Sequence, residues 1–361
     1  MSRISPEENE MRDTAILVVL LSGVSFGAAA QTKFEVDPYW PQPLPDKWIL
    51  AQIGGVCVDS HDHIAIVDRN NITDEEAQTN IPVPTFVLFD RDGNVAHSWG
   101  DPDIAPTDVH GCSFDDDDNL WVAGNEDAIV QSYNHDGELL LQIGTKGLFD
   151  TNDGTMEGQF TNQSRDRLNR PSGAVVDPTN GDIYISDGYG NKRVVVFDKE
   201  GNYLRQWGTH ATAAERAAKT PGTFANVVHC IELSNEGFVY VCDRQGSRVQ
   251  VFDKMGNHVR DIHIARTDDF VEDPVLRGTA WWVAFSPDEE QRYLYVMNGA
   301  EEKVHVLDHA TGETLSTFGR PGHLLGNFIH GHTIATDSDG NLYVAETNFG
   351  RRVQRFNNVS D

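Results

Sequence analysis

A pattern of four short apolar segments separated by turn residues recurs from Gly55 to the end of the chain. The clearest copy reads PSGAVVDPTNGDIYISDGYGNKRVVVFDKEGNYLRQWG at 171–208, with turns at DPTNG, DGYGNK and DKEGN. Short apolar runs between clusters of Gly, Asn and Asp indicate β-strands. A single sheet of four such strands leaves both faces exposed, and neighbouring copies in a ring cover them. The repeat therefore predicts the blades of a β-propeller.

The number of copies predicts the number of blades. Six copies can be placed, so we expect an all-β fold, a six-bladed β-propeller of the NHL-repeat type over residues 55–361. The sixth copy shows only three strands before the chain ends, and we expect KFEVD at 33–37 to add the missing outer strand. The copies cover 55–100, 110–144, 171–208, 228–262, a segment from Trp281 onward, and 332–356.

The longest apolar run precedes the repeats and reads AILVVLLSGVSFGAAA at 15–30. Its short apolar centre and its small residues before Gln31 are typical of a signal peptide. A retained N-terminal anchor is the alternative for residues 1–30, and Met11 is an alternative start to Met1. Residues 31–54 form a proline-rich lead-in. We therefore expect an exported protein, periplasmic or extracellular, with no stable membrane span in its mature chain.

The charge balance argues against one class of partner. The chain has 56 Asp and Glu against 28 Lys and Arg, a formal net charge of −28. Nucleic-acid binding depends on a face rich in Lys and Arg, which the sequence lacks. We expect no nucleic-acid partner, and instead a soluble protein that repels anionic surfaces.

Two of the four cysteines, Cys230 and Cys242, fall on neighbouring strands of one predicted hairpin. A turn at Ser234–Gly237 would place Cys230 opposite Val241, so that Cys242 faces the other side of the sheet. A disulfide between them is then not expected. The predicted state of all four is a buried free thiol: Cys57, Cys112, Cys230 and Cys242.

Long insertions between the predicted strands occur at 69–84, 145–170 and 209–226. Such loops emerge on the rims of a propeller, where a binding pocket is built. The pair Trp281-Trp282 opens the fifth copy, and we expect these rings to pack between blades rather than to contact a ligand.

Three of the fourteen histidines, His110, His229 and His332, occupy equivalent points in the second, fourth and sixth copies. Each stands at the entrance of an innermost strand, so their side chains should converge on the central channel from three directions. Three imidazoles with an open fourth position are typical of a catalytic zinc site. The alternative for each is a channel histidine bonded to water or backbone. His330 should lie on the same strand face as His332, as a flanking group or a competing ligand.

Three further side chains are candidates for catalysis: Tyr189, Arg69 and Arg244. Tyr189 follows an inner strand in SDGYGNKR and, beside a metal and an arginine, can act as a general base. Each arginine follows an aspartate at the end of a second strand and can bind a substrate carboxylate through two hydrogen bonds. The alternatives are a tyrosine packed on the rim, and structural pairs of the arginines with Asp68 and Asp243.

Taken in order, these residues resemble the peptidyl-α-hydroxyglycine α-amidating lyases among the NHL-repeat propellers. The resemblance spans roughly residues 50–356 and is strongest in VVDPTNGDIYISDGYGNKRVVVFDKEGNYLRQWG, VHCIEL, VYVCDRQGSRVQVF and HGHTIATDSDGNLYVAE. It implies that the three histidines hold a catalytic zinc and that the tyrosine and both arginines act on the substrate. The implied reaction cleaves a C–N bond and gives a peptide amide and glyoxylate.

Three positions depart from the family pattern. Thr333 stands where the family has an aspartate that helps to bind a structural calcium, so a calcium ion is doubtful here. His330 replaces a methionine beside the metal site. Gly190 replaces a cysteine, so the family's disulfide at that position cannot form.

The sequence thus predicts a zinc-dependent lyase that acts on a peptidyl-α-hydroxyglycine or a related α-hydroxy, hemiaminal-like substrate that carries a carboxylate. One alternative is a non-catalytic NHL propeller that binds a protein or a glycan. Another is a metal-dependent hydrolase or lactonase on the same scaffold, but such sites usually hold calcium through carboxylates and amides, which a histidine triad does not offer. G-x-S-x-G, Walker and H-E-x-x-H motifs are absent from the chain, so those chemistries have no motif support.

Overall fold

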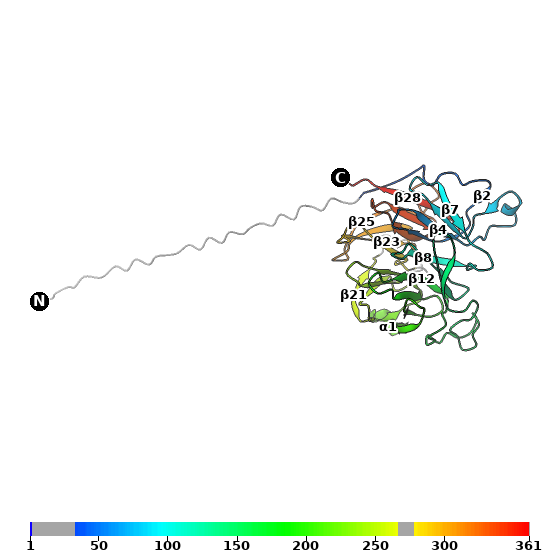
Figure 1. Cartoon of the computed structure of the whole chain (residues 1–361). Helices are drawn as coiled ribbons and strands as arrows, with labels where there is room; N and C mark the ends of the chain where they lie inside the picture. The colour runs from blue at the N-terminus through cyan, green and yellow to red at the C-terminus, as the bar shows by residue number, and fades with distance from the viewer. Residues whose placement is uncertain (2–32, 266–277, 361) are drawn as a thin grey trace. The chain divides into compact units, whose positions relative to one another are not determined.

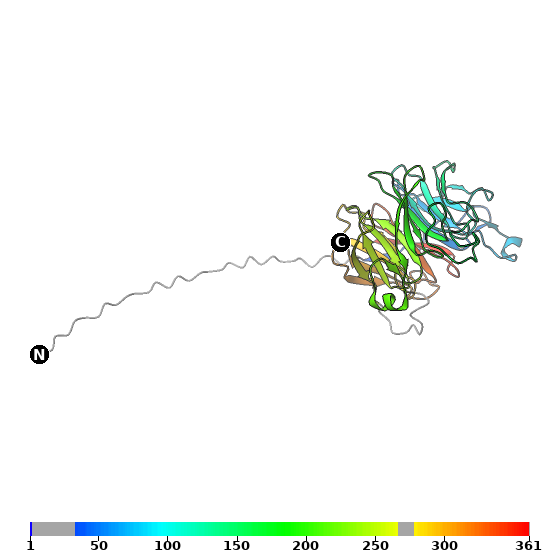
Figure 2. The ribbon, with the colours of Figure 1, turned by 90° about the horizontal axis from the view of Figure 1, so that it is seen from below.

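The computed structural model describes Met1 and residues 33–265 and 278–360. Its main elements are six four-stranded antiparallel sheets, which confirms the predicted six-bladed β-propeller. Among the described residues, α-helix is confined to α1 (Ala213–Ala218), which lies at the periphery (Figures 1 and 2). The predicted signal peptide or anchor falls almost wholly outside the described residues.

The first three blades run from an inner to an outer strand in chain order. Blade 1 starts at Ile53, two residues before the predicted start of the propeller. The strands are β3 (Ile53–Val58), β4 (Ile64–Asp68), β6 (Phe86–Phe89) and β7 (Val95–Trp99); β8 (Val109–Phe114), β9 (Leu120–Gly124), β10 (Ile129–Tyr133) and β11 (Leu139–Ile143); β12 (Pro171–Val176), β13 (Ile183–Asp187), β14 (Arg193–Phe197) and β15 (Tyr203–Trp207).

Blades 4 and 5 follow the same order, whereas blade 6 takes its outer strand from the start of the chain. Their strands are β18 (Val228–Leu233), β19 (Val239–Asp243), β20 (Arg248–Phe252) and β21 (His258–His263); β22 (Trp282–Phe285), β23 (Tyr293–Asn298), β24 (Lys303–Asp308) and β25 (Thr314–Phe318); β26 (Gly331–Thr336), β27 (Leu342–Glu346), β28 (Arg352–Asn358) and β1 (Phe34–Val36). The lead-in and the rim insertions add two parallel pairs and one short 3-10 helix: β2 (Trp48–Ile49) with β5 (Ile81–Pro82), β16 (Thr209–His210) with β17 (Thr223–Phe224), and η1 (Glu76–Gln78).

The ring closes where the first strand of the chain pairs with the last. In β1 and β28, Phe34 lies opposite Asn358 and Val36 opposite Phe356. Figure 1 shows β28, in red, beside the blue strands of blade 1. Trp40 strengthens this junction because its ring packs on Phe89 of blade 1 and on Tyr343 of blade 6, with centroid separations of 5.6 and 4.9 Å.

The core lies between the blades. Middle strands such as β9 are buried along their whole length, because the sheets on both sides cover them. Outer strands such as β11 are mostly exposed, including Leu139 and Leu140. The continuous apolar runs of the sequence are therefore the middle strands, as expected for sheets covered on both faces.

The cysteine prediction was wrong, because disulfides join Cys57 to Cys112 and Cys230 to Cys242. The turn between β18 and β19 holds one more residue than the pattern indicated, so Leu233 pairs with Val239. A register shift of one residue moves every side chain to the other face. It brings Cys230 against Cys242, with 4.9 Å between their Cα atoms.

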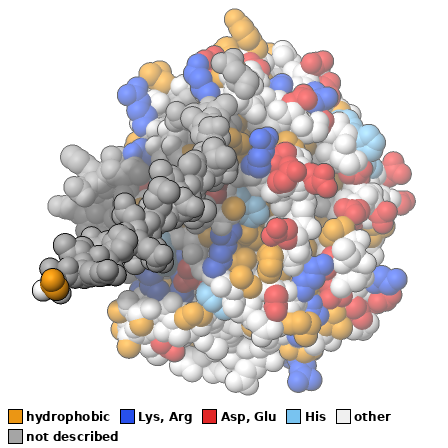
Figure 3. Space-filling view, turned by 90° about the vertical axis from the view of Figure 1, so that its left-hand side faces the viewer, with side chains coloured by type: hydrophobic (Ala, Val, Ile, Leu, Met, Phe, Trp, Pro, Cys, Tyr) orange, Lys and Arg blue, Asp and Glu red, His pale blue; other side chains and the backbone are white. Residues whose placement is uncertain are grey.

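The surface is strongly acidic, in line with the formal net charge of −28. On the face drawn in Figure 3, carboxylates form several clusters with arginine and lysine side chains scattered between them. None of the described helices has the length and apolar character needed to cross a lipid bilayer.

Candidate metal centre

The three histidines of the sequence pattern meet at one end of the central channel. Each is the second residue of an inner strand: His110 in β8, His229 in β18 and His332 in β26. Their ring centroids lie 4.6 to 5.0 Å apart, and all three side chains are buried. One ligand nitrogen from each lies within 4.8 Å of the others, so this group can hold a metal ion.

A β-bulge at the start of each inner strand aims these side chains. The pairing register shifts at Val109–Cys112 in β8, between Val228 and Ile231 in β18, and between Gly331 and Thr333 in β26. A bulge inserts an extra residue and re-aims the side chain beside it. The convergence of the histidines therefore depends on a local irregularity that strict strand alternation does not predict.

The second ring nitrogen of each histidine is held by the neighbouring blade. The Nδ1 atoms lie 2.7 Å from Ser172 O, 2.7 Å from Trp281 O and 2.8 Å from Gly54 O, for His110, His229 and His332 respectively. A carbonyl oxygen only accepts, so Nδ1 carries the proton and Nε2 keeps its lone pair. Such contacts fix the tautomer and orientation of metal-binding imidazoles.

Burial keeps the three imidazoles neutral. Desolvation is the largest cause that lowers their pKa values, followed by the charges of neighbouring histidines and arginines. The pKa of His332 falls to about 3, and those of His110 and His229 lie well below their usual range. A metal binds the neutral form, so the triad is ready to coordinate at neutral pH.

Tyr189 completes this cluster from the loop between β13 and β14. Its hydroxyl oxygen lies 3.0 Å from Nε2 of His110 and 3.0 Å from Nε2 of His229. Nη1 of Arg244 lies 3.3 Å from the same oxygen. The tyrosine therefore turns over the channel, and its phenol is not packed on the outer rim.

The two candidate arginines differ in their charge partners. Arg69 forms an ion pair of 2.9 Å with Asp108. Among the described residues, no carboxylate forms an ion pair with Arg244, whose guanidinium instead lies over the rings of Tyr189 and Trp281. Its buried Nε has no hydrogen-bond partner among the described side chains and backbone. A guanidinium in this state is suited to an anion supplied by a ligand.

The aspartates that precede these arginines do not pair with them. Asp68 accepts hydrogen bonds from the backbone N–H groups of Ala51 and Asn70. Asp243 pairs with Arg248 at 3.0 Å. The predicted alternative of a structural Asp–Arg pair within each dipeptide is therefore wrong.

A cavity of about 560 Å³ opens above the cluster, and it reveals residues that the sequence did not single out. Arg170 ends one of the predicted rim insertions, and its guanidinium lies 5.6 Å from the centroid of the Tyr189 ring. Asn125 accepts a hydrogen bond of 3.1 Å from Nε of Arg170. Trp281 also lines the cavity, although its ring is buried and packs in the core, as expected for a residue between blades.

His330 lines the same cavity but is not one of the three clustered histidines. It precedes β26 and has a φ of 56°, so the alternation that would place it on the face of His332 does not apply. Its ring lies 5.9 Å from that of Phe349. The prediction that both histidines share one strand face was therefore wrong.

The donor set fits one kind of metal better than another. Three neutral imidazole nitrogens with an open side suit zinc or a similar transition metal. Calcium takes oxygen ligands. At the position where the resemblance implies a calcium ligand, the Thr333 hydroxyl accepts the backbone N–H of Val56 at 3.0 Å. The residues present therefore fit a nitrogen-bound metal, and calcium stays doubtful.

A second group of possible ligands, Asp59, His61 and Asp118, lies in the turns that follow the inner strands. Asp59 accepts the backbone N–H groups of His61 and His63 and contacts the ring of His63 at 2.8 Å. In the next blade, Asn119 takes the place of His63, and it contacts the carboxylate of Asp115 in the same way through its backbone N–H and its side-chain amide. Because an amide replaces the imidazole there, these contacts belong to the repeated turn structure.

The other end of the channel holds a separate cavity of about 320 Å³. Apolar side chains such as Val58, Phe114 and Phe285 line it, together with the carboxyl of Glu232. Burial raises the pKa of Glu232 to about 8. Trp282 lines this cavity, and its ring centroid lies 6.3 and 6.1 Å from those of His110 and His229, so this indole lies between the cavity and the metal centre.

Comparisons with known proteins agree with the resemblance predicted from the sequence. A family model described as NHL repeat matches residues 168–197. "Peptidyl-alpha-hydroxyglycine alpha-amidating lyase 1" of Drosophila melanogaster is 27% identical over 308 residues, which cover 80% of this chain and 51% of that protein. "NHL repeat-containing protein 3" of Homo sapiens is 29% identical over 244 residues, covering 65% of this chain and 62% of that protein.

"Peptidyl-glycine alpha-amidating monooxygenase A" of Xenopus laevis is 25% identical over 337 residues. The match covers 86% of this chain and 32% of that protein, so the chain spans about a third of that relative's length. These relatives confirm the resemblance to NHL-repeat proteins and α-amidating lyases.

Solved structures support the propeller fold alone. A streptogramin B lyase aligns over 92% of this chain and all of its own, with a TM-score of 0.56 and 10% identity. A gluconolactonase of Xanthomonas campestris aligns over 86% of this chain and 87% of its own, with a TM-score of 0.53 and 15% identity.

Proposed function

We propose that this protein is a zinc-dependent lyase that cleaves the C–N bond of a peptidyl-α-hydroxyglycine or a related hemiaminal-like substrate. The observation that carries the proposal is the position of the Tyr189 hydroxyl, 3.0 Å from the free ring nitrogens of two histidines of the triad. A proton acceptor beside an open metal position is the arrangement that such an elimination requires.

His110, His229 and His332 would hold the zinc through Nε2. When bound, zinc supplies a Lewis acid that polarises the substrate hydroxyl and favours its deprotonation. The three Nδ1–H contacts to backbone carbonyls keep the imidazoles in the orientation that this role needs.

Tyr189, as the phenolate, would accept the proton of the substrate hydroxyl. As the electrons of that O–H bond form the C=O bond of glyoxylate, the C–N bond would break and the amide nitrogen would take this proton back from the Tyr189 phenol, which restores the phenolate. The sum is one peptide amide and one glyoxylate, with no net change in protons. Phenol and substrate must lie within hydrogen-bond reach for this transfer.

Arg244 would hold the terminal carboxylate of the substrate, because no carboxylate among the described residues pairs with it. Arg69 is already paired with Asp108, so it would contribute a hydrogen-bonded, partly neutralised guanidinium to the same cavity. A bidentate contact fixes the orientation of the carboxylate as well as binding it.

Export also belongs to the proposal. The two disulfides support it, since structural disulfides form and persist outside the reducing cytosol.

A second candidate is a propeller that binds a protein or glycan without catalysis, since similarity extends to a relative named only for its NHL repeats. Metal analysis separates the candidates. Protein purified without chelators should contain about one zinc per chain if the triad is catalytic. A folded protein without metal would favour the binding module.

Tyr189→Phe is the direct test of the catalytic assignment. We expect glyoxylate release from a model α-hydroxyglycine peptide to fall by roughly 100-fold or more, since general-base catalysis contributes about 10²–10⁴-fold. Metal content should be unchanged, because the three histidines remain.

Tyr39→Phe is the matched control, because this tyrosine is 80% exposed and lies in the lead-in. It should keep the wild-type rate. Equal rates in wild type and Tyr189→Phe would refute the base assignment.

A further inference from the structure

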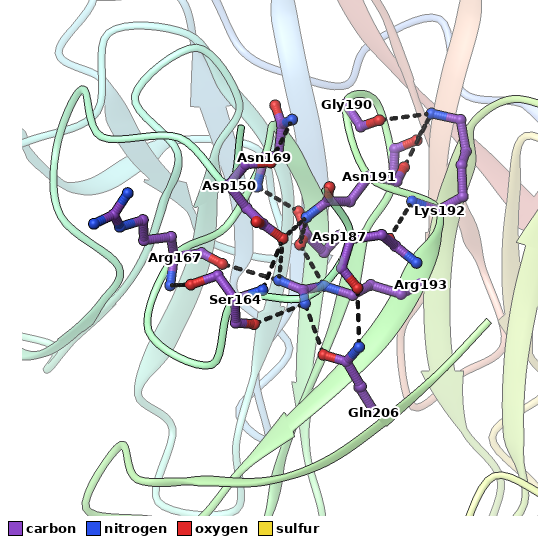
Figure 4. Close-up of polar contacts among 12 residues, drawn as sticks. Asp150, Ser164, Arg167, Asn169, Asp187, Gly190, Asn191, Lys192, Arg193 and Gln206 are labelled. Carbon is purple, nitrogen blue, oxygen red and sulfur yellow. Dashed lines mark hydrogen bonds and ion pairs between the residues drawn. The ribbon is translucent and has the colours of Figure 1, made fainter. Parts of the chain in front are cut away.

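The loop that carries Tyr189 is wrapped around a single buried ammonium group. Nζ of Lys192 lies 3.0 Å from Gly188 O, 2.9 Å from Tyr189 O, 3.2 Å from Gly190 O and 2.9 Å from Asn191 O. Figure 4 shows the lysine side chain folded back so that its nitrogen meets the loop carbonyls. Four successive carbonyl dipoles therefore converge on one positive charge.

This charge has no carboxylate partner within ion-pair distance among the described residues, unlike its neighbour in the sequence. Arg193 pairs with Asp187 at 2.9 Å and with Asp150 at 3.4 Å. Lys192 is only 4% exposed, and burial lowers its pKa to about 8, so it is mostly protonated at neutral pH. A buried ammonium is costly unless its donors are satisfied, and here the loop backbone satisfies them.

The carbonyl oxygens depend on the lysine in return. Those of Tyr189, Gly190 and Asn191 accept no other hydrogen bond from the described residues. Removing the ammonium would leave these buried or part-buried acceptors unpaired, which is unfavourable until the backbone moves or water enters. The loop would relax at the residue whose side chain reaches the metal centre.

Glycines on both sides of Tyr189 make the backbone close-packed but intrinsically permissive. A Cβ at Gly188 would lie 1.9 Å from Val228 O, and one at Gly190 would lie 2.0 Å from Asn169 Oδ1. Glycine loses more conformational freedom on ordering than any other residue. The hydrogen bonds from Lys192 offset this freedom across the whole loop.

We propose that Lys192 is a positioning residue: by binding the backbone of residues 188–191, it holds the Tyr189 hydroxyl at the histidine triad. The kinetic part of this inference rests on the proposed lyase function. Lys192 does not itself line the cavity above the histidines, and it reaches that site through the backbone carbonyl of Tyr189, so its effect on the reaction must pass through the loop.

Lys192→Met tests this role, because it removes the charge and the donors but keeps a long side chain. We expect kcat to fall by roughly 10- to 100-fold, the loss typical of a small misplacement of a reacting group, with KM within about twofold of wild type. The zinc content should not change. Lys199→Met is the matched control, because that side chain is 72% exposed in a nearby turn, and it should behave as wild type.

A double-mutant cycle with Tyr189→Phe separates positioning from a general structural role. If Lys192 acts through the phenol, Lys192→Met should reduce the residual glyoxylate release of Tyr189→Phe by less than about twofold. An equal loss in both backgrounds would overturn the inference. Where Lys192→Met does not fold, Lys192→Gln, which retains two donors, takes its place; if this variant also fails to fold, a folding role replaces the positioning role.

Amide hydrogen exchange provides a readout that needs no activity. In Lys192→Met we expect faster exchange at residues 188–191 than in Lys199→Met, with unchanged exchange in β8, β18 and β26. Unchanged exchange in the loop would overturn the inference even in an active enzyme. If the wild-type protein releases no glyoxylate, the lyase proposal fails, and the exchange comparison still decides whether Lys192 orders the loop.

Discussion

At the metal centre, the role open to each side chain depends on the other polar contacts that the same side chain makes. Each imidazole of the triad has Nδ1 on a backbone carbonyl of the next blade, which leaves Nε2 for a metal. Arg244 differs from Arg69 in the same way, because among the described residues only Arg69 has a carboxylate in ion-pair contact with it. Residue type alone predicts the candidates, whereas these second contacts decide their roles.

The difference between the arginines leads to a prediction about substrate charge. Arg244→Met should reduce kcat/KM by roughly 10- to 100-fold for a substrate with a free terminal carboxylate, since hydrogen bonds to charged groups contribute about 1.5–3 kcal/mol. The methyl ester of the same substrate should lose much less. Steady-state kinetics on both compounds measure the difference.

Arg292→Met is the control for this comparison, because its side chain is 68% exposed. It should retain the wild-type preference for the acid over the ester. If Arg244→Met also retains that preference, another group binds the carboxylate.

At the scale of strands and turns, apolar alternation predicted where the blades lie but not their irregularities. The turn after β18 holds one more residue than expected, which reversed the conclusion about Cys230 and Cys242. The sequence pattern also did not predict the bulges that orient His110 and His229. A bulge or a longer turn changes register by one residue, and the same apolar pattern is compatible with either register.

The first strand of the chain offers a test at this scale. Asp37 N–H bonds to Arg355 O and Val359 N–H to Lys33 O, so alternation places Glu35 and Asn357 in a hydrogen-bonded pair between them. Glu35→Pro removes that ladder hydrogen bond, which typically contributes about 0.5–1.5 kcal/mol, and should lower the melting temperature by a few degrees. Thermal unfolding followed by circular dichroism measures the shift.

Glu35→Ala keeps the backbone donor and removes only a side chain that is 60% exposed. It should melt within about a degree of wild type, since exposed ion pairs contribute little. Equal melting temperatures for the proline variant and wild type would show that β1 does not stabilise the ring.

For the propeller as a whole, the central channel has two chemically different ends. One end holds the neutral histidine triad with arginines around it, and the other holds a cavity lined by Glu232 together with apolar side chains such as Phe114 and Phe285. Trp282 lies between them, and a Cβ at Gly111 would lie 2.1 Å from its ring. Both ends are built from residues on the inner strands of several blades, so neither site forms until the blades have assembled into the ring.

Glu232 makes stability depend on pH in a defined direction. Burial raises its pKa in the folded state to about 8, above the value of 4.5 for an ordinary glutamate. Its contribution to stability is therefore fully present below about pH 4.5 and is lost as pH rises through 8. Glu232→Gln cannot ionise, so its melting temperature should fall less than that of wild type between pH 5 and 9.

Glu236→Gln provides the comparison, because that residue lies exposed in the turn after β18. It should follow the wild-type profile, so the general effect of a highly acidic surface cancels. Parallel profiles for Glu232→Gln and wild type would contradict the assignment of a protonated carboxyl.

The amino-acid sequence by itself determined the six-bladed ring and the equivalent positions of His110, His229 and His332, because turn residues and apolar periodicity are local signals that repeat. The tertiary structure alone decided which atoms meet there: the Nδ1 contacts across blades, the Arg244 guanidinium against the Tyr189 hydroxyl, and the four carbonyls around Lys192. These contacts join residues on different strands and depend on bulges, turn lengths and ring closure. A one-residue change in any of them alters the distances by several ångströms while leaving the pattern of the sequence almost unchanged.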